Sequence, residues 1–225
     1  MTVDLRVEVF DDVEAMAREA ASFVAARARI AAAEHGSFTF AVSGGATPRP
    51  MFEALRADDD VPWTSTAIFQ VDERVAPPGH AERNLTHLEA HLLDGLGDRP
   101  SVHPMPVDDA DLERAAAGYA AELPAAFDLI HLGIGADGHT ASLVPGDPVL
   151  EVADREVAVT DVYEGWRRMT LTYPVLDGAR DVLWLIAGEE KAESFARLRE
   201  RDPSIPAGRV RAGRQIVFAD RAATR

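Results

Sequence analysis

The amino-acid sequence predicts an α/β fold in which a mostly parallel sheet is flanked by helices. Strand-like and helix-like segments alternate along almost the whole chain, as in folds built from strand–helix–strand units. Two strand-like segments, 127–135 and 181–188, are nearly continuous apolar runs. Such runs are typical of central parallel strands that are buried on both faces of a sheet.

The remaining elements follow from local patterns. Strands are expected at 3–9, 37–43, 66–72, 127–135, 155–161, 168–173, 181–188 and 214–220. Asp11 or Asp12 can cap a long Ala-rich helix to about His35. Helices are also expected at 48–57, from an Asn84 cap through Leu93, from an Asp108 cap through Leu123, and from about Glu189.

Length and composition limit the class of protein. A chain of 225 residues with no convincing linker predicts one domain, 1–225, with room for a small extra lobe. The absence of cysteine excludes disulfides and thiolate metal sites. A formal net charge of −15 without a basic cluster argues against nucleic acid as a partner. No apolar stretch is long enough for a membrane, and the N-terminus lacks signal-peptide features, so we expect a cytoplasmic protein.

Polar or glycine-rich segments follow four of the predicted strands. In open α/β sheets, ligands bind outside the carboxyl ends of the strands, so these segments should border one site. They are SGGATP at 43–48, DER at 72–74, ADGHTAS at 136–142 and EEK at 189–191.

The SGGATP segment has the features of an anion-binding loop. Gly44 and Gly45 let backbone N–H groups approach an oxyanion, and the helix N-terminus after Pro48 adds unpaired donors and partial positive charge. A tight strand-to-helix turn without a ligand is the alternative. The segment matches neither the P-loop nor the dinucleotide-binding pattern, so a nucleotide is not indicated.

A carboxylate and an imidazole stand two residues apart in the stretch LGIGADGHTASL, which contains the third of these segments. Asp137 and His139 can border one pocket, where the histidine would act as a general base and the carboxylate would orient it. An Asp-Gly turn with an exposed histidine is the alternative. His131 lies within an apolar strand and is interpreted as a hydrogen-bonded core residue.

His87 and His91 are spaced i, i+4 on a predicted helix and could share a metal ion. The zinc-protease pattern requires Glu directly after the first histidine, whereas Leu88 stands there, and no third ligand is evident. We therefore expect no metal and no other cofactor.

Five segments, in order along nearly the whole chain, resemble the 6-phosphogluconolactonase family. They are SGGATP, FQVDERVAP followed by Asn84, LGIGADGHTASLVPG, RRMTLT and LIAGEEKAE. The resemblance implies a Rossmann-like fold. The chain departs from the family pattern where Val144 replaces Phe, where Arg83 replaces Ser, and where Val217 stands near the usual Trp.

The resemblance implies hydrolysis of 6-phospho-D-glucono-1,5-lactone, the second step of the oxidative pentose phosphate pathway, by a monomer or small homo-oligomer. It assigns His139 as the base, Asp137 as its partner or a substrate-orienting group, and Arg74 to the oxyanion or the phosphate. The residues expected to hold the sugar phosphate are Ser43, Gly44, Gly45, Thr47, Asp72, Arg168 and Lys191. A lactone is an activated ester, so water and a general base suffice for its hydrolysis.

Two other functions are compatible with the same fold. The related glucosamine-6-phosphate deaminases share the sugar-phosphate loop and a DGH segment. They usually have Tyr where Arg74 stands, and a carboxylate-bearing run after DGH where this chain has Thr140–Leu143. A non-catalytic sugar-phosphate sensor is the third possibility, although no helix-turn-helix segment flanks the predicted domain.

Overall fold

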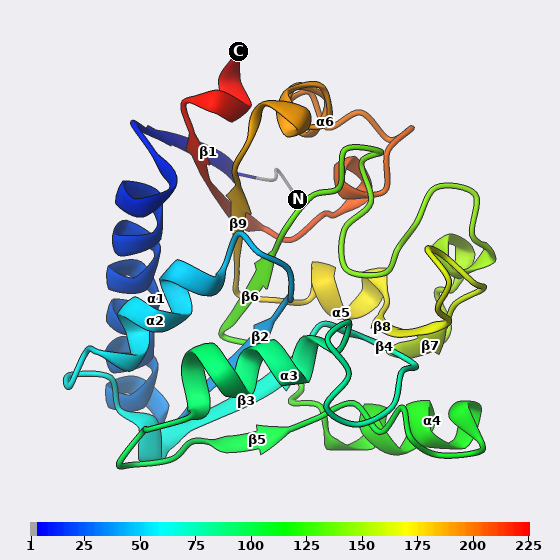
Figure 1. The fold of residues 1–225 in the computed structure, drawn as a ribbon, viewed down its shortest axis with the longest axis horizontal. Helices are drawn as coiled ribbons and strands as arrows, with labels where there is room; N and C mark the ends of the chain where they lie inside the picture. The colour runs from blue at the N-terminus through cyan, green and yellow to red at the C-terminus, as the bar shows by residue number, and fades with distance from the viewer. Residues whose placement is uncertain (1–3) are drawn as a thin grey trace.

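The computed structural model describes residues 4–225, which contain a main sheet of seven parallel strands (Figure 1). Its strand order is β1-β10-β9-β6-β2-β3-β5. The strands are β1 (Asp4–Phe10), β2 (Phe38–Val42), β3 (Thr66–Gln70), β5 (Ser101–His103), β6 (Leu129–Leu132), β9 (Asp181–Ile186) and β10 (Arg214–Asp220). The predicted α/β fold with a mostly parallel sheet is confirmed.

Helices cover the two faces of this sheet. One hydrophobic core lies under α1 (Val13–His35), α2 (Arg49–Arg56) and α3 (Asn84–Leu88), which a π-helical turn at Glu89–Leu93 continues. The other core lies under α4 (Leu112–Glu122), α5 (Tyr173–Asp177) and α6 (Ala192–Arg199). Short 3₁₀ turns are Trp63–Ser65, Pro148–Glu151, Glu189–Lys191, Ala207–Arg209 and Ala222–Thr224. Every residue of β6 and β9 is buried, as their apolar runs predicted.

A second, antiparallel sheet lies beside the carboxyl end of the main one, at the right of Figure 1. It has the order β4-β8-β7 and consists of β4 (Asp72–Arg74), β8 (Arg168–Leu171) and β7 (Val157–Val159). Val71 joins the two sheets, because its N–H donates to the Val42 carbonyl at 2.9 Å and its own carbonyl accepts from Leu171 N–H at 2.8 Å. The predicted strand 66–72 is therefore divided between two sheets.

Two of the predicted helix caps are wrong. Asp12 does cap α1, with its carboxylate 2.8 Å from Ala15 N. Helix α4 instead begins after Asp111, which accepts from Arg114 N at 3.0 Å, whereas Asp108 forms an ion pair with Arg83.

Asn84 does not cap α3 either. It is the first residue of that helix, and its side-chain amide donates to the Asp72 carbonyl at 2.9 Å. The polar side chain thus joins α3 to β4.

Val3, where the first predicted strand begins, lies outside the described residues.

A fully buried carboxylate fixes the segment that joins β4 to α3. The Glu73 side chain is 0% exposed, and it forms an ion pair with the buried Arg83 at 3.2 Å. It also accepts hydrogen bonds of 2.8 Å from the side chain of Gln70 and the backbone N–H groups of Arg74, Asn84 and Leu85. Arg83, a departure from the family pattern, therefore has a structural role.

Glu73→Gln should destabilise the fold, because it removes the charge that compensates the buried Arg83 guanidinium. Breaking a buried pair from one side costs about 3 kcal/mol or more. Asp108→Asn is the matched control, since Asp108 contacts the same guanidinium but is half exposed, and its loss should cost less than about 1 kcal/mol. Urea unfolding measures both free energies; equal values would contradict the anchoring role of Glu73.

Candidate active site

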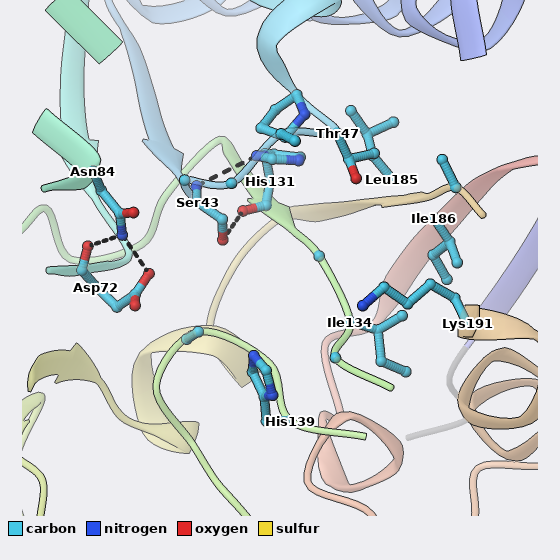
Figure 2. A pocket seen from close by; sticks show the side chains of 18 of the residues that line it. Ser43, Thr47, Asp72, Asn84, His131, Ile134, His139, Leu185, Ile186 and Lys191 are labelled. Carbon is cyan, nitrogen blue, oxygen red and sulfur yellow. Dashed lines mark hydrogen bonds between the residues drawn. The ribbon is translucent and has the colours of Figure 1, made fainter. Parts of the chain in front are cut away.

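The carboxyl ends of β2 and β6 lie side by side, although the chain leaves them in opposite directions across the sheet. From β2 it continues to β3 and β5, and from β6 it continues to β9 and β10. Such a switch in strand order leaves a crevice at the carboxyl edge, where open α/β folds bind ligands. A cavity of about 300 Å³ lies there (Figure 2).

Nine of the ten predicted site residues line this cavity: Ser43, Gly44, Gly45, Thr47, Asp72, Arg74, His139, Arg168 and Lys191. The tenth, Asp137, contacts His139. The four predicted segments therefore converge at one place, as their positions after parallel strands implied.

The loop after β2 is anchored at Ser43. Its N–H donates to Nδ1 of His131 at 3.3 Å, and its hydroxyl donates to the His131 carbonyl at 3.0 Å (Figure 2). Within residues 4–225, the N–H groups of 44–47 donate to no acceptor. Gly45 has φ 98°, and a Cβ on Gly44 would lie 2.0 Å from Oδ1 of Asn84. The loop thus borders the cavity with unpaired donors, whereas both donors of Ser43 are already engaged.

His131 is buried, as its apolar strand predicted, but it is not fully hydrogen-bonded. Burial lowers its pKa to about 3, so the ring is neutral near pH 7. Because Nδ1 accepts from Ser43, the ring hydrogen resides on Nε2. That Nε2 is buried and has no hydrogen-bond partner in the described part of the chain.

A tight turn after β6 brings Asp137 and His139 together. Gly135 N–H donates to the His139 carbonyl at 2.8 Å, and Gly138, with φ 84°, donates to the Gly135 carbonyl at 3.0 Å. Nδ1 of His139 lies 2.6 Å from Oδ1 of Asp137. The other carboxylate oxygen accepts from the Tyr163 hydroxyl at 3.1 Å.

These contacts determine which nitrogen of His139 is basic. Burial alone would raise the pKa of Asp137, but hydrogen bonds from His139 and Tyr163 and the charge of His139 lower it well below its usual value. An ionised carboxylate can only accept, so Nδ1 of His139 donates to it and Nε2 keeps its lone pair. The imidazole, whose side chain is 25% exposed, can therefore take a proton from a water molecule in the cavity.

Two arginines face each other across the small sheet. The register pairs Arg74 of β4 with Arg168 of β8, and both line the cavity. Like charges directly opposite each other destabilise a strand pair. In both side chains Nε is buried and has no hydrogen-bond acceptor in residues 4–225. An anion between the two guanidinium groups would relieve this repulsion.

The contacts of the cationic side chains differ. Arg74 donates to the Asn84 side chain at 2.6 Å, whereas Arg168 donates to Glu164 at 3.1 Å and lies over the Tyr163 ring. Lys191 reaches the cavity from the turn after β9 and, within residues 4–225, forms no side-chain hydrogen bond or ion pair (Figure 2).

Asp72 is the buried carboxylate of the cavity. Its oxygens accept from the Ser142 hydroxyl at 2.7 Å and from the Asn84 amide at 3.2 Å. These contacts hold the carboxylate at the cavity wall, where it can accept a hydrogen bond from a ligand hydroxyl group.

The two helical histidines do not form a metal site. His91 bonds to Glu53 at 2.8 Å, and His87 bonds to the Ala81 carbonyl at 2.8 Å. In residues 4–225, no three His, Cys, Asp or Glu side chains are grouped so that they could hold a metal ion.

The helices of the same residues are all too short or too polar to span a bilayer.

Comparison with known proteins identifies the family. The model of the glucosamine-6-phosphate isomerases/6-phosphogluconolactonase family matches residues 11–218. The chain belongs to this family. It is 38% identical over 212 residues to the 6-phosphogluconolactonase of Synechocystis, covering 88% of this chain and 87% of that protein. It is 36% identical over 211 residues to the 6-phosphogluconolactonase of Streptomyces coelicolor, covering 84% and 80%.

Solved structures of the family share the fold. The 6-phosphogluconolactonase of Thermotoga maritima superposes with a TM-score of 0.87 at 26% identity, over 97% of this chain and 100% of that one. A monomeric glucosamine-6-phosphate deaminase superposes with a TM-score of 0.83 at 17% identity, over 98% and 100%, which shows a common fold and no more.

Gly135→Ala should disrupt the His139–Asp137 pair, because the new Cβ would lie 2.1 Å from Nδ1 of His139 and 2.5 Å from Oδ1 of Asp137. Displacing a catalytic group by about 1 Å can cost roughly 100-fold in rate, so we expect kcat for lactone hydrolysis to fall by about that factor. Gly118→Ala, whose Cβ meets nothing within 4 Å, is the control and should keep full activity. A fully active Gly135→Ala protein with an unchanged melting temperature would show that the rate does not depend on this pair.

Proposed function

We propose that this protein hydrolyses 6-phospho-D-glucono-1,5-lactone to 6-phospho-D-gluconate, the second step of the oxidative pentose phosphate pathway. The main observation is that one cavity is lined both by His139, which is bonded to Asp137, and by an anion-binding wall. This wall consists of Arg168, Lys191 and the N–H groups of 44–47, which have no acceptor within residues 4–225. Curated relatives named 6-phosphogluconolactonase, at 31–38% identity and high coverage, support this substrate.

The chemistry begins with a water molecule beside His139. Nε2 takes a proton from this water as its oxygen bonds to C1 of the lactone, and the C1–ring oxygen bond then breaks. The ring oxygen takes up the proton and becomes the hydroxyl group of the product acid. A positioned base contributes about 10²–10⁴-fold to such a step. Asp137 orients the imidazole and fixes its tautomer, and Arg74 stabilises the negative oxygen that develops at C1.

The other end of the substrate is held by the anion-binding wall. Arg168, Lys191 and the N–H groups of 44–47 bind the 6-phosphate, while Ser43 anchors the loop and Asp72 accepts from a sugar hydroxyl group. Holding the phosphate fixes C1 against the base, so that binding energy remote from C1 supports the chemical step.

The deaminase and sensor alternatives have less support. Ring opening by a deaminase would need a carboxylate after the DGH segment, but Thr140 there bonds to the Gly133 carbonyl at 2.9 Å and Ser142 bonds to Asp72. A sensor would not need the His139–Asp137 hydrogen bond.

We further propose a single domain over 1–225 that acts as a monomer or small homo-oligomer. The single family match over residues 11–218 supports the one-domain organisation. A cytoplasmic location stays a prediction from composition.

The purified protein should release 6-phosphogluconate from freshly prepared 6-phosphogluconolactone, and a coupled dehydrogenase assay measures this product. His139→Asn should lower kcat by roughly 10²–10⁴-fold while leaving the affinity for 6-phosphogluconate nearly unchanged. Ammonia release from glucosamine 6-phosphate without lactonase activity would favour the deaminase, and product binding with neither activity would favour the sensor.

Arg168→Ala and Lys191→Ala should each lower kcat/KM by about 10- to 100-fold, because each removes a charge-assisted hydrogen bond to the phosphate. The loss should shrink for gluconolactone without the phosphate. Arg74→Ala should reduce activity on both substrates if Arg74 faces the oxyanion, and on the phosphorylated lactone alone if it faces the phosphate. Equal losses on both substrates for the first two variants would remove them from the phosphate site.

A further inference from the structure

A structured hairpin carries Tyr163 to the active site. Tyr163 and Trp166 exchange backbone hydrogen bonds of 3.0 and 3.2 Å, and Glu164 and Gly165 between them have positive φ angles of 49° and 84°. The hairpin connects β7 to β8, so it leads directly to Arg168. None of the sequence motifs included this tyrosine.

The Tyr163 side chain contacts both proposed ends of the active site. Its hydroxyl donates to Oδ2 of Asp137 at 3.1 Å, and its ring meets the His139 ring edge-on, with centroids 5.6 Å apart. The Arg168 guanidinium lies over the same ring, 4.9 Å from its centroid. Tyr163 is not among the residues that line the cavity, so it acts through these neighbours.

The hydroxyl completes the coordination of a partly exposed carboxylate. The Asp137 side chain is 37% exposed, and its Oδ1 bonds to His139. A hydrogen bond to Oδ2 fixes the rotation of the carboxylate plane and therefore the direction of the imidazole. Burial and the charge of Asp137 raise the pKa of Tyr163 to about 12, so its hydroxyl remains a donor at neutral pH.

The ring has a separate effect on Arg168. The Arg168 side chain is 3% exposed, and one terminal nitrogen bonds to the exposed Glu164. A cation over an aromatic face is attracted to it, so the ring favours one position of the guanidinium at the cavity wall.

We propose that Tyr163 is a positioning residue that orients the Asp137–His139 pair through its hydroxyl and Arg168 through its ring. The inference rests on the proposed lactonase function and adds a link between the base and the phosphate-binding cation. Because the two contacts use different parts of one side chain, they can be removed separately.

The experiment compares Tyr163→Phe and Tyr163→Leu on gluconolactone with and without the 6-phosphate. Tyr163→Phe removes only the hydroxyl, and we expect kcat to fall about tenfold on both lactones with KM unchanged. Tyr163→Leu should show the same loss and, in addition, a roughly three- to tenfold rise in KM for the phosphorylated lactone alone. Val162 lies on the same hairpin and is 67% exposed. Val162→Ala is therefore the control, and it should change neither kcat nor KM.

Two kinetic results would overturn the inference: an unchanged kcat in Tyr163→Phe, or identical constants for the Phe and Leu variants. Thermal unfolding of each variant separates these effects from loss of the fold.

A second measurement does not depend on turnover. The Nδ1–H proton of His139 should give a downfield NMR signal, assigned by its loss in His139→Asn, which shifts or broadens in Tyr163→Phe. If the wild type hydrolyses neither lactone, the proposed function fails, but a changed signal still supports the orienting role of the hydroxyl. An unchanged signal contradicts that role whatever the activity.

Discussion

The order of the parallel strands is the constraint on which the site depends. Because β2 and β6 are neighbours whose chains then diverge, the loops after them leave the sheet without filling the space between them. One loop starts α2, and its N–H groups at 44–47 have no acceptor in the part of the chain that the structure describes. The other turns at Gly135 and Gly138 and places His139 against Asp137. Neither loop alone could both bind the substrate and supply the catalytic base. The adjacency of β2 and β6 therefore places the binding loop beside the His139–Asp137 pair.

Charge is distributed unevenly over the molecule. The chain has a formal net charge of −15, yet Arg74, Arg168 and Lys191 gather at one cavity. Two carboxylates, Asp72 and Glu190, line the same cavity, so its charged lining holds three cations against two anions. At physiological salt the screening length is about 8 Å, so carboxylates farther away contribute little. The two sheets make the grouping possible, since Val71 takes the chain from β3 into β4 and the register then places Arg74 opposite Arg168. An anion bound between these two arginines would relieve their mutual repulsion.

The sequence predicted the features that depend on local pattern and on strand ends. The apolar runs of β6 and β9 and the segments after the strands were interpreted correctly, because burial and the shared carboxyl edge follow directly from a parallel sheet. Contacts between distant segments were missed. The Asp108 and Asn84 caps were wrong because tertiary partners, Arg83 and Asp72, engage those side chains. No sequence pattern pointed to Tyr163. Its contacts with Asp137 and His139 arise only in the folded protein, where the β7–β8 hairpin lies against the loop after β6.

The central claim is that one substrate spans the cavity, with its phosphate at the loop after β2 and C1 at His139. A crystal structure of the protein with 6-phosphogluconate tests this claim most directly. The account predicts phosphate oxygens about 2.7–3.2 Å from Arg168, Lys191 and the amides of 44–47, and the C1 carboxylate beside Nε2 of His139. A product bound in the reverse direction, with its phosphate against His139 and its carboxylate in the SGGATP loop, would contradict it.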